Sequence, residues 1–305
     1  MNEKDLLESS FCGIKFKNPI VPASGTFGYG REFEEFYPLS ALGGISVKGT
    51  TGQRRNGNLP PRIAETPGGM LNSVGLQNPG IDHFIEHELP YLKTKDTVVI
   101  ANIAGSTAEE YREVAEKLDD TDVDMIEVNI SCPNVKAGGA AFGVSCEGAA
   151  AITKIVRGVT KKPVMMKLSP NVTDIASIAK ACEAEGADAV SLINTLLGMR
   201  IDIKTRRPVL HNNVGGLSGS AVFPVAVRMV WQVANAVNIP VCGMGGVSCW
   251  EDAVEMMMAG ASLIQVGAAI FTDLMTPVNI IRGLEEYCRR ENMRISDIVG
   301  SVQPW

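Results

Sequence analysis

The residues best suited to reaction chemistry in this chain lie in the stretch from Val128 to Gly139. This stretch reads Val128-Asn129-Ile130-Ser131-Cys132-Pro133-Asn134 before it runs on to two glycines. The apolar run Met125–Val128 predicts a strand in front of it, and Pro133 ends that strand because proline has no N–H to donate to a ladder. A thiol and two carboxamides therefore lie where a buried strand opens into a loop.

Cys132 is the candidate reactive group of this stretch. A thiol has an unperturbed pKa of about 8.5, so it can act as a general base near neutral pH, whereas Ser131 would be a far poorer base. The three histidines, His83, His87 and His211, lie away from this stretch, so no Cys–His pair of the protease kind is predicted. The pattern favours proton abstraction over covalent acyl chemistry.

Polar residues or glycines end each of eight short β-rich runs. In chain order these ends are Ser24, Lys48, Asn102, Asn129 with Cys132, Lys167, Asn194 with Thr195, Gly245-Gly246, and Gly267-Ala268. One polar residue at a strand end usually marks only the approach to solvent. In a barrel of parallel strands these ends converge on the face that holds the active site, so we expect a ligand site there.

The glycines after the last two runs predict a phosphate site. Loops after the seventh and eighth strands of such barrels commonly bind phosphate together with a helix N-terminus. Glycine lets backbone N–H groups approach the phosphate oxygens closely, although Gly245-Gly246 alone would also fit a tight turn.

Lysines and asparagines on the same face indicate the rest of the ligand. Lys48 and Lys167 each end an apolar run, where an ammonium is costly to bury unless it meets an anion or reaches solvent along its stem. A cation at Lys167 could stabilise negative charge on a reduced ring system. The carboxamides of Asn102, Asn129 and Asn194 suit the amide edges of a planar heterocycle, although asparagine more often caps turns.

The elements that would position these residues alternate along the chain. The β-rich runs are Pro19–Gly25, Gly44–Thr50, Thr97–Ala104, Met125–Cys132, Pro163–Ser169, Ala189–Thr195, Ile239–Gly245 and Leu263–Ala268. The amphipathic segments between them are Ala108–Leu118, Gly148–Val159, Ile175–Glu185, Val222–Val237 and Trp250–Ala259. Nearly continuous apolar runs that alternate with helices favour a (β/α)8 TIM barrel. Phe11–Asn18 predicts an N-terminal hairpin, and Thr51–Gly80 and Leu197–Gly219 are predicted to be long functional loops on the active-site face.

Length and composition are consistent with one barrel domain over residues 1–305. The chain is 45% hydrophobic, and its net charge of −6 argues against a nucleic-acid partner. No stretch is long and apolar enough to span a membrane, and no signal peptide is recognisable at the start. The seven cysteines are scattered without C-x-x-C spacing, which predicts free thiols in a cytoplasmic protein and no metal or iron–sulfur site within the chain.

Two motifs resemble those of a known family. Asn129-Ile130-Ser131-Cys132-Pro133-Asn134 resembles the catalytic motif of dihydroorotate dehydrogenases, and Met70–Gly80 resembles their substrate loop. The similarity runs from Phe11 to about Phe271. It implies an FMN-binding (β/α)8 barrel that oxidises dihydroorotate to orotate in pyrimidine synthesis.

The resemblance also implies a role for each matching residue. Cys132 corresponds to the base that takes the C5 proton while a hydride leaves C6 for FMN, and a cysteine here is typical of the class 1 enzymes that are not membrane-associated. The implied substrate residues are Lys48, Asn72, Ser73, Val74, Gly75, Leu76, Asn129, Asn194 and Thr195. The implied FMN residues are Ser24, Lys48, Gly49, Asn102, Asn129, Lys167, Ile193, Gly219, Gly245, Gly246, Gly267 and Ala268.

The loop Val135–Gly143 is similar to that of subclass 1B, whereas 1A enzymes carry a proline-containing loop there. The resemblance thus implies a partner subunit with FAD and a [2Fe-2S] cluster that reduces NAD+, in a heterotetramer built on a homodimer. Ala268 departs from the threonine common in relatives, which removes one hydroxyl contact to phosphate. Val144-Ser145-Cys146 departs from the expected Thr-Asp.

Four other interpretations stay open at this point. They are a fumarate-linked class 1A enzyme, an FMN enzyme for another dihydropyrimidine such as dihydrouracil, a flavin-free isomerase or aldolase barrel with Lys167 as its reactive amine, and a non-catalytic assembly subunit. The concentration of reactive groups on one face counts against the last.

Overall fold

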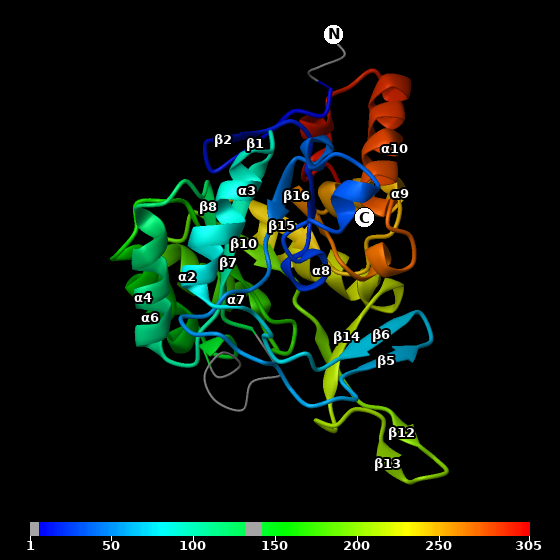
Figure 1. Ribbon diagram of the computed structural model, residues 1–305. Helices are drawn as coiled ribbons and strands as arrows, with labels where there is room; N and C mark the ends of the chain where they lie inside the picture. Colours follow the sequence, from blue (N-terminus) through cyan, green and yellow to red (C-terminus); the bar gives the residue numbers. More distant parts are fainter. Residues whose placement is uncertain (1–5, 132–141) are drawn as a thin grey trace.

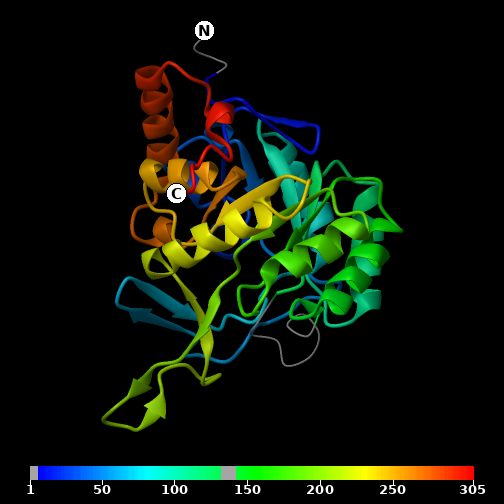
Figure 2. The same cartoon turned by 180° about the vertical axis from the view of Figure 1, so that it is seen from behind.

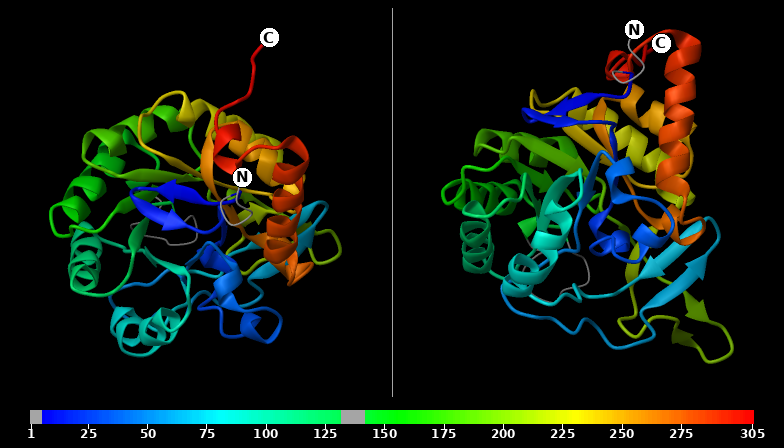
Figure 3. Two further views of the ribbon diagram at one scale, coloured as in Figure 1. Left: turned by 90° about the horizontal axis from the view of Figure 1, so that it is seen from above. Right: turned by 45° about the horizontal axis from the view of Figure 1, so that its top comes forward.

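The chain folds around a barrel of eight parallel strands. The computed structural model describes residues 6–131 and 142–305, so the predicted base Cys132 and most of the predicted 1B loop lie outside the described residues. The sheet order is β3-β16-β15-β10-β9-β8-β7-β4. The Gly43 amide donates to the Ile20 carbonyl at 3.1 Å, which brings the two ends of this order together and closes the barrel (Figure 3). The predicted (β/α)8 barrel is confirmed.

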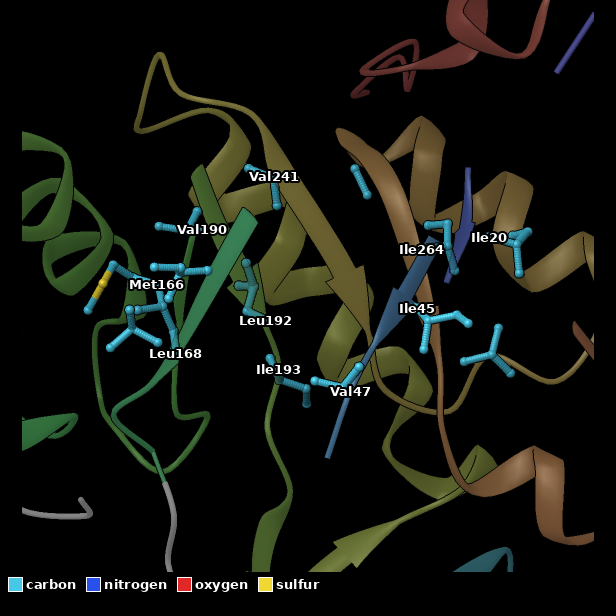
Figure 4. Packing of buried hydrophobic residues seen from close by; sticks show 14 of the residues in the cluster. Ile20, Ile45, Val47, Met166, Leu168, Val190, Leu192, Ile193, Val241 and Ile264 are labelled. Atoms are coloured by element: carbon cyan, nitrogen blue, oxygen red, sulfur yellow. The ribbon is translucent and has the colours of Figure 1, made fainter. Parts of the chain in front are cut away.

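Each predicted β-rich run contains or overlaps one barrel strand. The strands are β3 (Ile20–Pro22), β4 (Gly44–Ser46), β7 (Val98–Ile103), β8 (Met125–Asn129), β9 (Val164–Lys167), β10 (Ala189–Leu192), β15 (Val241–Met244) and β16 (Ala261–Val266). Their residues are almost all buried because helices cover the outside of the barrel and side chains fill its inside. Figure 4 shows Val190, Val241 and Ile264 of the larger apolar cluster on three of these strands.

Helices surround the barrel (Figure 2). The longer ones are α4 (Ala108–Asp119), α6 (Cys146–Arg157), α7 (Ile175–Ala184), α8 (Phe223–Ala234), α9 (Trp250–Met258) and α10 (Thr276–Glu291), and short ones are α1 (Ser24–Phe27), α2 (Ile81–His83) and α3 (Leu89–Lys93). Thr107, Ser145 and Asp174 start α4, α6 and α7, each accepting a hydrogen bond from the amide three residues on. The five predicted helices are confirmed, but α10 was missed, although its buried Ile280, Leu284 and Cys288 recur every four residues.

The predicted N-terminal hairpin closes the end of the barrel opposite the site. It consists of β1 (Ser9–Phe11) and β2 (Ile14–Phe16), and its Phe11 and Phe16 are fully buried. These rings pack on Ile100, Met125 and Met165 in a second apolar cluster. Apolar side chains thus fill this end of the barrel, and Figure 1 shows the hairpin at the end away from β5 (Ile63–Thr66), β6 (Gly69–Asn72) and β14 (Gly215–Ser218).

The prediction that residues 51–80 and 197–219 are long functional loops was wrong in part, because both segments contain strands. Strands from both segments form one antiparallel sheet in the order β11 (Leu196–Gly198), β14 (Gly215–Ser218), β6 (Gly69–Asn72) and β5 (Ile63–Thr66). A further hairpin, β12 (Ile201–Asp202) with β13 (Arg207–Pro208), extends away from the barrel (Figure 1). The strands are too short to show a period-2 pattern, and they depend on partners far away in sequence, such as Gly216 opposite Asn72.

None of the described helices is both long enough and apolar enough to span a bilayer.

Candidate active site

A cavity of about 210 Å³ lies at the carboxyl ends of the barrel strands, next to the antiparallel sheet. The barrel side contributes residues that end or follow β3, β4, β8, β9, β10, β15 and β16. The sheet side contributes Ile63, Met70, Asn72 and Ser218. A wider hollow of about 830 Å³ adjoins it and shares Met70, Gly219, Gly246, Ala268 and Phe271. The convergence of strand ends that the sequence predicted is present here.

Most of the predicted site residues line this cavity. They are Lys48, Asn72, Val74, Gly75, Leu76, Asn129, Lys167, Ile193, Asn194, Thr195, Gly219, Gly245, Gly246, Gly267 and Ala268. Ser24, Gly49, Ser73 and Asn102 are buried but do not line it. Gly49 and Asn102 lie against each other, since a Cβ on Gly49 would stand 2.8 Å from the Asn102 Oδ1.

The carboxamides of Asn129 and Asn194 are joined through Ser131. Asn194 donates from Nδ2 to the Ser131 hydroxyl at 2.6 Å, and its Oδ1 accepts from the Thr195 amide at 2.8 Å. Asn129 Oδ1 accepts from the Ser131 amide at 3.2 Å. The last described residue before Cys132 is therefore anchored to two strand ends, β8 and β10.

Glu127 accepts hydrogen bonds from four other barrel strands, and the sequence analysis missed it. It lies fully buried on β8. Its carboxylate accepts hydrogen bonds of 2.6 to 2.8 Å from Ser46 Oγ, Asn102 Nδ2, Ser191 Oγ and Gln265 Nε2. Burial acts to raise the pKa of this carboxyl, but Lys167 and the hydrogen-bond donors outweigh it and lower the pKa, so Glu127 is ionised at neutral pH. The available signal was one charged residue inside the apolar run Met125–Val128.

Lys167 ends β9 with its side chain only 6% exposed, and its Nζ lies 3.8 Å from the Glu127 carboxylate. The anion that a buried ammonium requires is thus supplied by the protein itself. An ammonium held by a carboxylate has no lone pair to offer a carbonyl, which counts against Lys167 as a Schiff-base nucleophile.

The turns after β15 and β16 form a glycine-lined wall beside the start of α8. Gly246 has φ +82°, and a Cβ there would stand 2.8 Å from both the Gly219 carbonyl oxygen and the Phe223 Cβ. Only glycine fits this close approach without strain. Backbone groups and a helix N-terminus gathered in this way suit an anion such as phosphate.

Comparison with known proteins agrees with this geometry. A family model described as dihydroorotate dehydrogenase matches residues 6–288. The chain is 56% identical over 292 residues to the dihydroorotate dehydrogenase B (NAD(+)) catalytic subunit of Phocaeicola vulgatus, covering 95% of this chain and 96% of that protein. It is 54% identical over 298 residues to the protein of the same name from Thermoanaerobacter pseudethanolicus, covering 97% and 99%. The chain belongs to the dihydroorotate dehydrogenase family.

Dihydroorotate dehydrogenases are flavin-dependent oxidoreductases, and two features of this cavity, together with one buried group outside its lining, fit a flavin. The Lys167 ammonium lines the cavity where a ring could meet it. The Asn102 Oδ1 is a buried acceptor that has no hydrogen-bond partner among the described residues. The glycine wall can approach a phosphate. This region of the chain therefore offers groups for both ends of a flavin nucleotide.

The loop that resembles the substrate loop of dihydroorotate dehydrogenases is held in place by Asn78. Its Oδ1 accepts from the Thr51 and Gly80 amides at 3.2 and 2.9 Å, and its Nδ2 donates to the Leu76 carbonyl at 2.7 Å. Val74, Gly75 and Leu76 therefore line the cavity as a fixed wall. Asn78 lies within the motif Met70–Gly80, but the sequence alone did not predict a role for it.

Proposed function

We propose that this chain oxidises (S)-dihydroorotate to orotate with one bound FMN, as the catalytic subunit of an NAD+-linked enzyme of pyrimidine synthesis. The observation that carries the proposal is the pairing of two sets of groups in one cavity. Carboxamides, Lys48 and the loop Asn72–Leu76 form one set, and Lys167 with the glycine wall forms the other. A substrate and a flavin would meet between them.

The substrate set is suited to a planar, anionic ring. Carboxamides of Asn72, Asn129 and Asn194 can pair with the amide edges of dihydroorotate, with Ser73, Val74, Gly75, Leu76 and Thr195 completing the site. Lys48 lies where an ammonium can pair with the substrate carboxylate. This carboxylate separates dihydroorotate from dihydrouracil, so the proposal requires a strong preference for the former.

The cofactor set would hold FMN along its length. Lys167, Asn102 and Asn129 would meet the ring, with Ser24, Lys48, Gly49 and Ile193 around it. Gly219, Gly245, Gly246, Gly267 and Ala268 would surround the phosphate, and backbone N–H at Ala268 would serve where the hydroxyl of a threonine is missing. When bound, FMN supplies the acceptor for the hydride from C6.

Cys132 is the proposed base for the C5 proton. Ser131, the residue before it in the sequence, is held by Asn129 and Asn194 at the ends of β8 and β10. A thiol there can be partly ionised near neutral pH and accept the proton without a histidine.

Electrons would leave through a partner subunit. The relatives are named catalytic subunits of NAD(+) enzymes, which supports a partner subunit. We propose that this partner carries FAD and a [2Fe-2S] cluster and that the assembly is a heterotetramer. Leu197, Met199, Ile201 and Ile203 alternate in sequence from β11 to just past β12 and are 48 to 88% exposed. An apolar stripe of this kind supports assembly, and we propose a homodimeric core.

The test compares substrates and acceptors on the purified chain. Dihydroorotate should reduce the bound flavin anaerobically, and dihydrouracil at the same concentration should not. Fumarate should reoxidise the chain poorly, and NAD+ should do so only with the partner subunit present. Protein without flavin, or reduction by dihydrouracil alone, would contradict the proposal.

A further inference from the structure

Glu127 lies in the interior of the barrel, and the proposed chemistry gives it no role. It ties β8 to Ser46 on β4, Asn102 on β7, Lys167 on β9, Ser191 on β10 and Gln265 on β16. A buried carboxylate is costly, and a barrel interior would pack as well with apolar residues. Packing alone therefore does not explain a carboxylate at position 127.

The carboxylate fixes which way its neighbours point. An ionised carboxylate only accepts hydrogen bonds, so Asn102 and Gln265 must each turn an NH2 group toward it. Their oxygens, Asn102 Oδ1 and Gln265 Oε1, are buried and have no partner among the described residues. The Asn102 oxygen lies beside Gly49, the residue that follows the cavity-lining Lys48. Glu127 thus fixes the Asn102 oxygen as a buried acceptor behind Gly49, with no partner among the described residues.

Glu127 also constrains the ammonium of Lys167. The two charges lie 3.8 Å apart, and both side chains are nearly inaccessible to water. The side chain of Lys167 makes no hydrogen bond to the part of the chain that the structure describes, so the N–H groups of its ammonium stay available to a molecule in the cavity that it lines. The carboxylate holds this ammonium in place and offsets its charge.

We propose that Glu127 is a positioning residue for the flavin, which orients Asn102 and Lys167 and balances the charge of Lys167. The inference rests on the proposed function, since it assumes a flavin in this cavity. Its consequence has a definite sign. A reduced flavin carries more negative charge than an oxidised one, so an unbalanced Lys167 favours reduction and an unbalanced Glu127 opposes it.

The experiment measures the midpoint potential and the FMN affinity of the purified chain and four variants. Glu127→Gln keeps the shape and removes the charge, Lys167→Met removes the opposite charge, and the double variant removes both. Ser191→Ala is the matched control, because it deletes one hydrogen bond to the same carboxylate without a change of charge. Potentials come from equilibration with a reference dye, and affinities from quenching of FMN fluorescence.

Glu127→Gln should raise the potential by at least the equivalent of a tenfold change in the reduction equilibrium, about 30 mV for a two-electron couple. Lys167→Met should lower it, the double variant should lie between the two, and Ser191→Ala should shift it by less than either. Equal potentials in wild type and Glu127→Gln, or shifts of the same sign in both single variants, would overturn the proposal.

Glu127→Asp decides the matter if Glu127→Gln does not fold. It keeps the charge but withdraws the carboxylate, so FMN should bind at least tenfold more weakly in a folded protein, and unchanged affinity would overturn the role. A wild-type chain without flavin would defeat the proposed function together with this inference. A flavin-loaded wild type that dihydroorotate reduces, with unchanged variants, would defeat the inference alone.

Discussion

Replacement of Gly246 by alanine tests the phosphate wall quantitatively. At φ +82° an alanine is strained by about 1–2 kcal/mol relative to glycine. Its Cβ would also stand 2.8 Å from the Gly219 oxygen and the Phe223 Cβ, and such overpacking costs about 1–3 kcal/mol. The free energy of unfolding should therefore fall by about 2–5 kcal/mol in total. The start of α8 must also move, so FMN should bind at least tenfold more weakly, since about 1.4 kcal/mol corresponds to tenfold.

Gly300→Ala is the matched control. Gly300 has φ +69°, but a Cβ there would meet nothing within 4 Å, and it does not line the cavity. This variant should lose only the strain of about 1–2 kcal/mol and keep its FMN affinity. Urea unfolding of the apo-protein gives the stabilities, and fluorescence titration with FMN and riboflavin gives the affinities. Riboflavin has no phosphate, so the loss at Gly246 should be larger for FMN. Equal FMN affinity in the two alanine variants would refute the assignment of this wall.

Three further predictions concern substrate binding, acid stability and assembly. Asn194→Ala removes the donor to Ser131 and a proposed substrate contact. The KM for dihydroorotate in steady-state assays should therefore rise about tenfold, while the FMN affinity stays unchanged. An unchanged KM would contradict a role of Asn194 in substrate binding. Glu127 has a pKa lowered below its usual range in the folded state, so its stabilising contribution is present above the pKa of the unfolded chain and is lost as pH falls through the folded value. Urea unfolding should therefore show wild type losing more stability than Glu127→Gln between pH 5 and pH 3, and parallel losses would contradict the ionised, buried carboxylate. Ile203 is an exposed apolar residue of the proposed dimer interface, so Ile203→Asp should weaken the homodimer in sedimentation velocity experiments, while Ile203→Leu should not. A dimer that Ile203→Asp leaves unchanged would place the interface elsewhere.

The barrel could be predicted from sequence because its strands carry their own signal. A parallel strand buried on both faces reads as an apolar run, such as Val98–Ile103, and the amphipathic helices between such runs repeat at helical spacing. The face of the site followed from the residues that end these runs. Those end residues did not reveal which side chains reach the cavity, and Ser24, Gly49 and Asn102 do not line it.

The antiparallel sheet and the role of Glu127 could not be predicted from the sequence, because both depend on contacts between distant segments. Strands β6 and β14 pair Leu71 with Leu217, and neither segment has a pattern that reveals its partner. In the sequence, Glu127 is recognisable only as one charged residue within an apolar strand. Its importance comes from donors on four other strands, at Ser46, Asn102, Ser191 and Gln265, which only the closed barrel brings together.

The most direct test of the central claim is anaerobic stopped-flow reduction of the flavin-loaded chain by dihydroorotate, in wild type and Cys132→Ala. Dihydroorotate should bleach the flavin absorbance of the wild type. Loss of the base should slow this reduction about 10²–10⁴-fold at neutral pH, with FMN binding unchanged. Wild-type flavin that dihydroorotate leaves oxidised, or a Cys132→Ala variant reduced at the wild-type rate, would contradict the central claim.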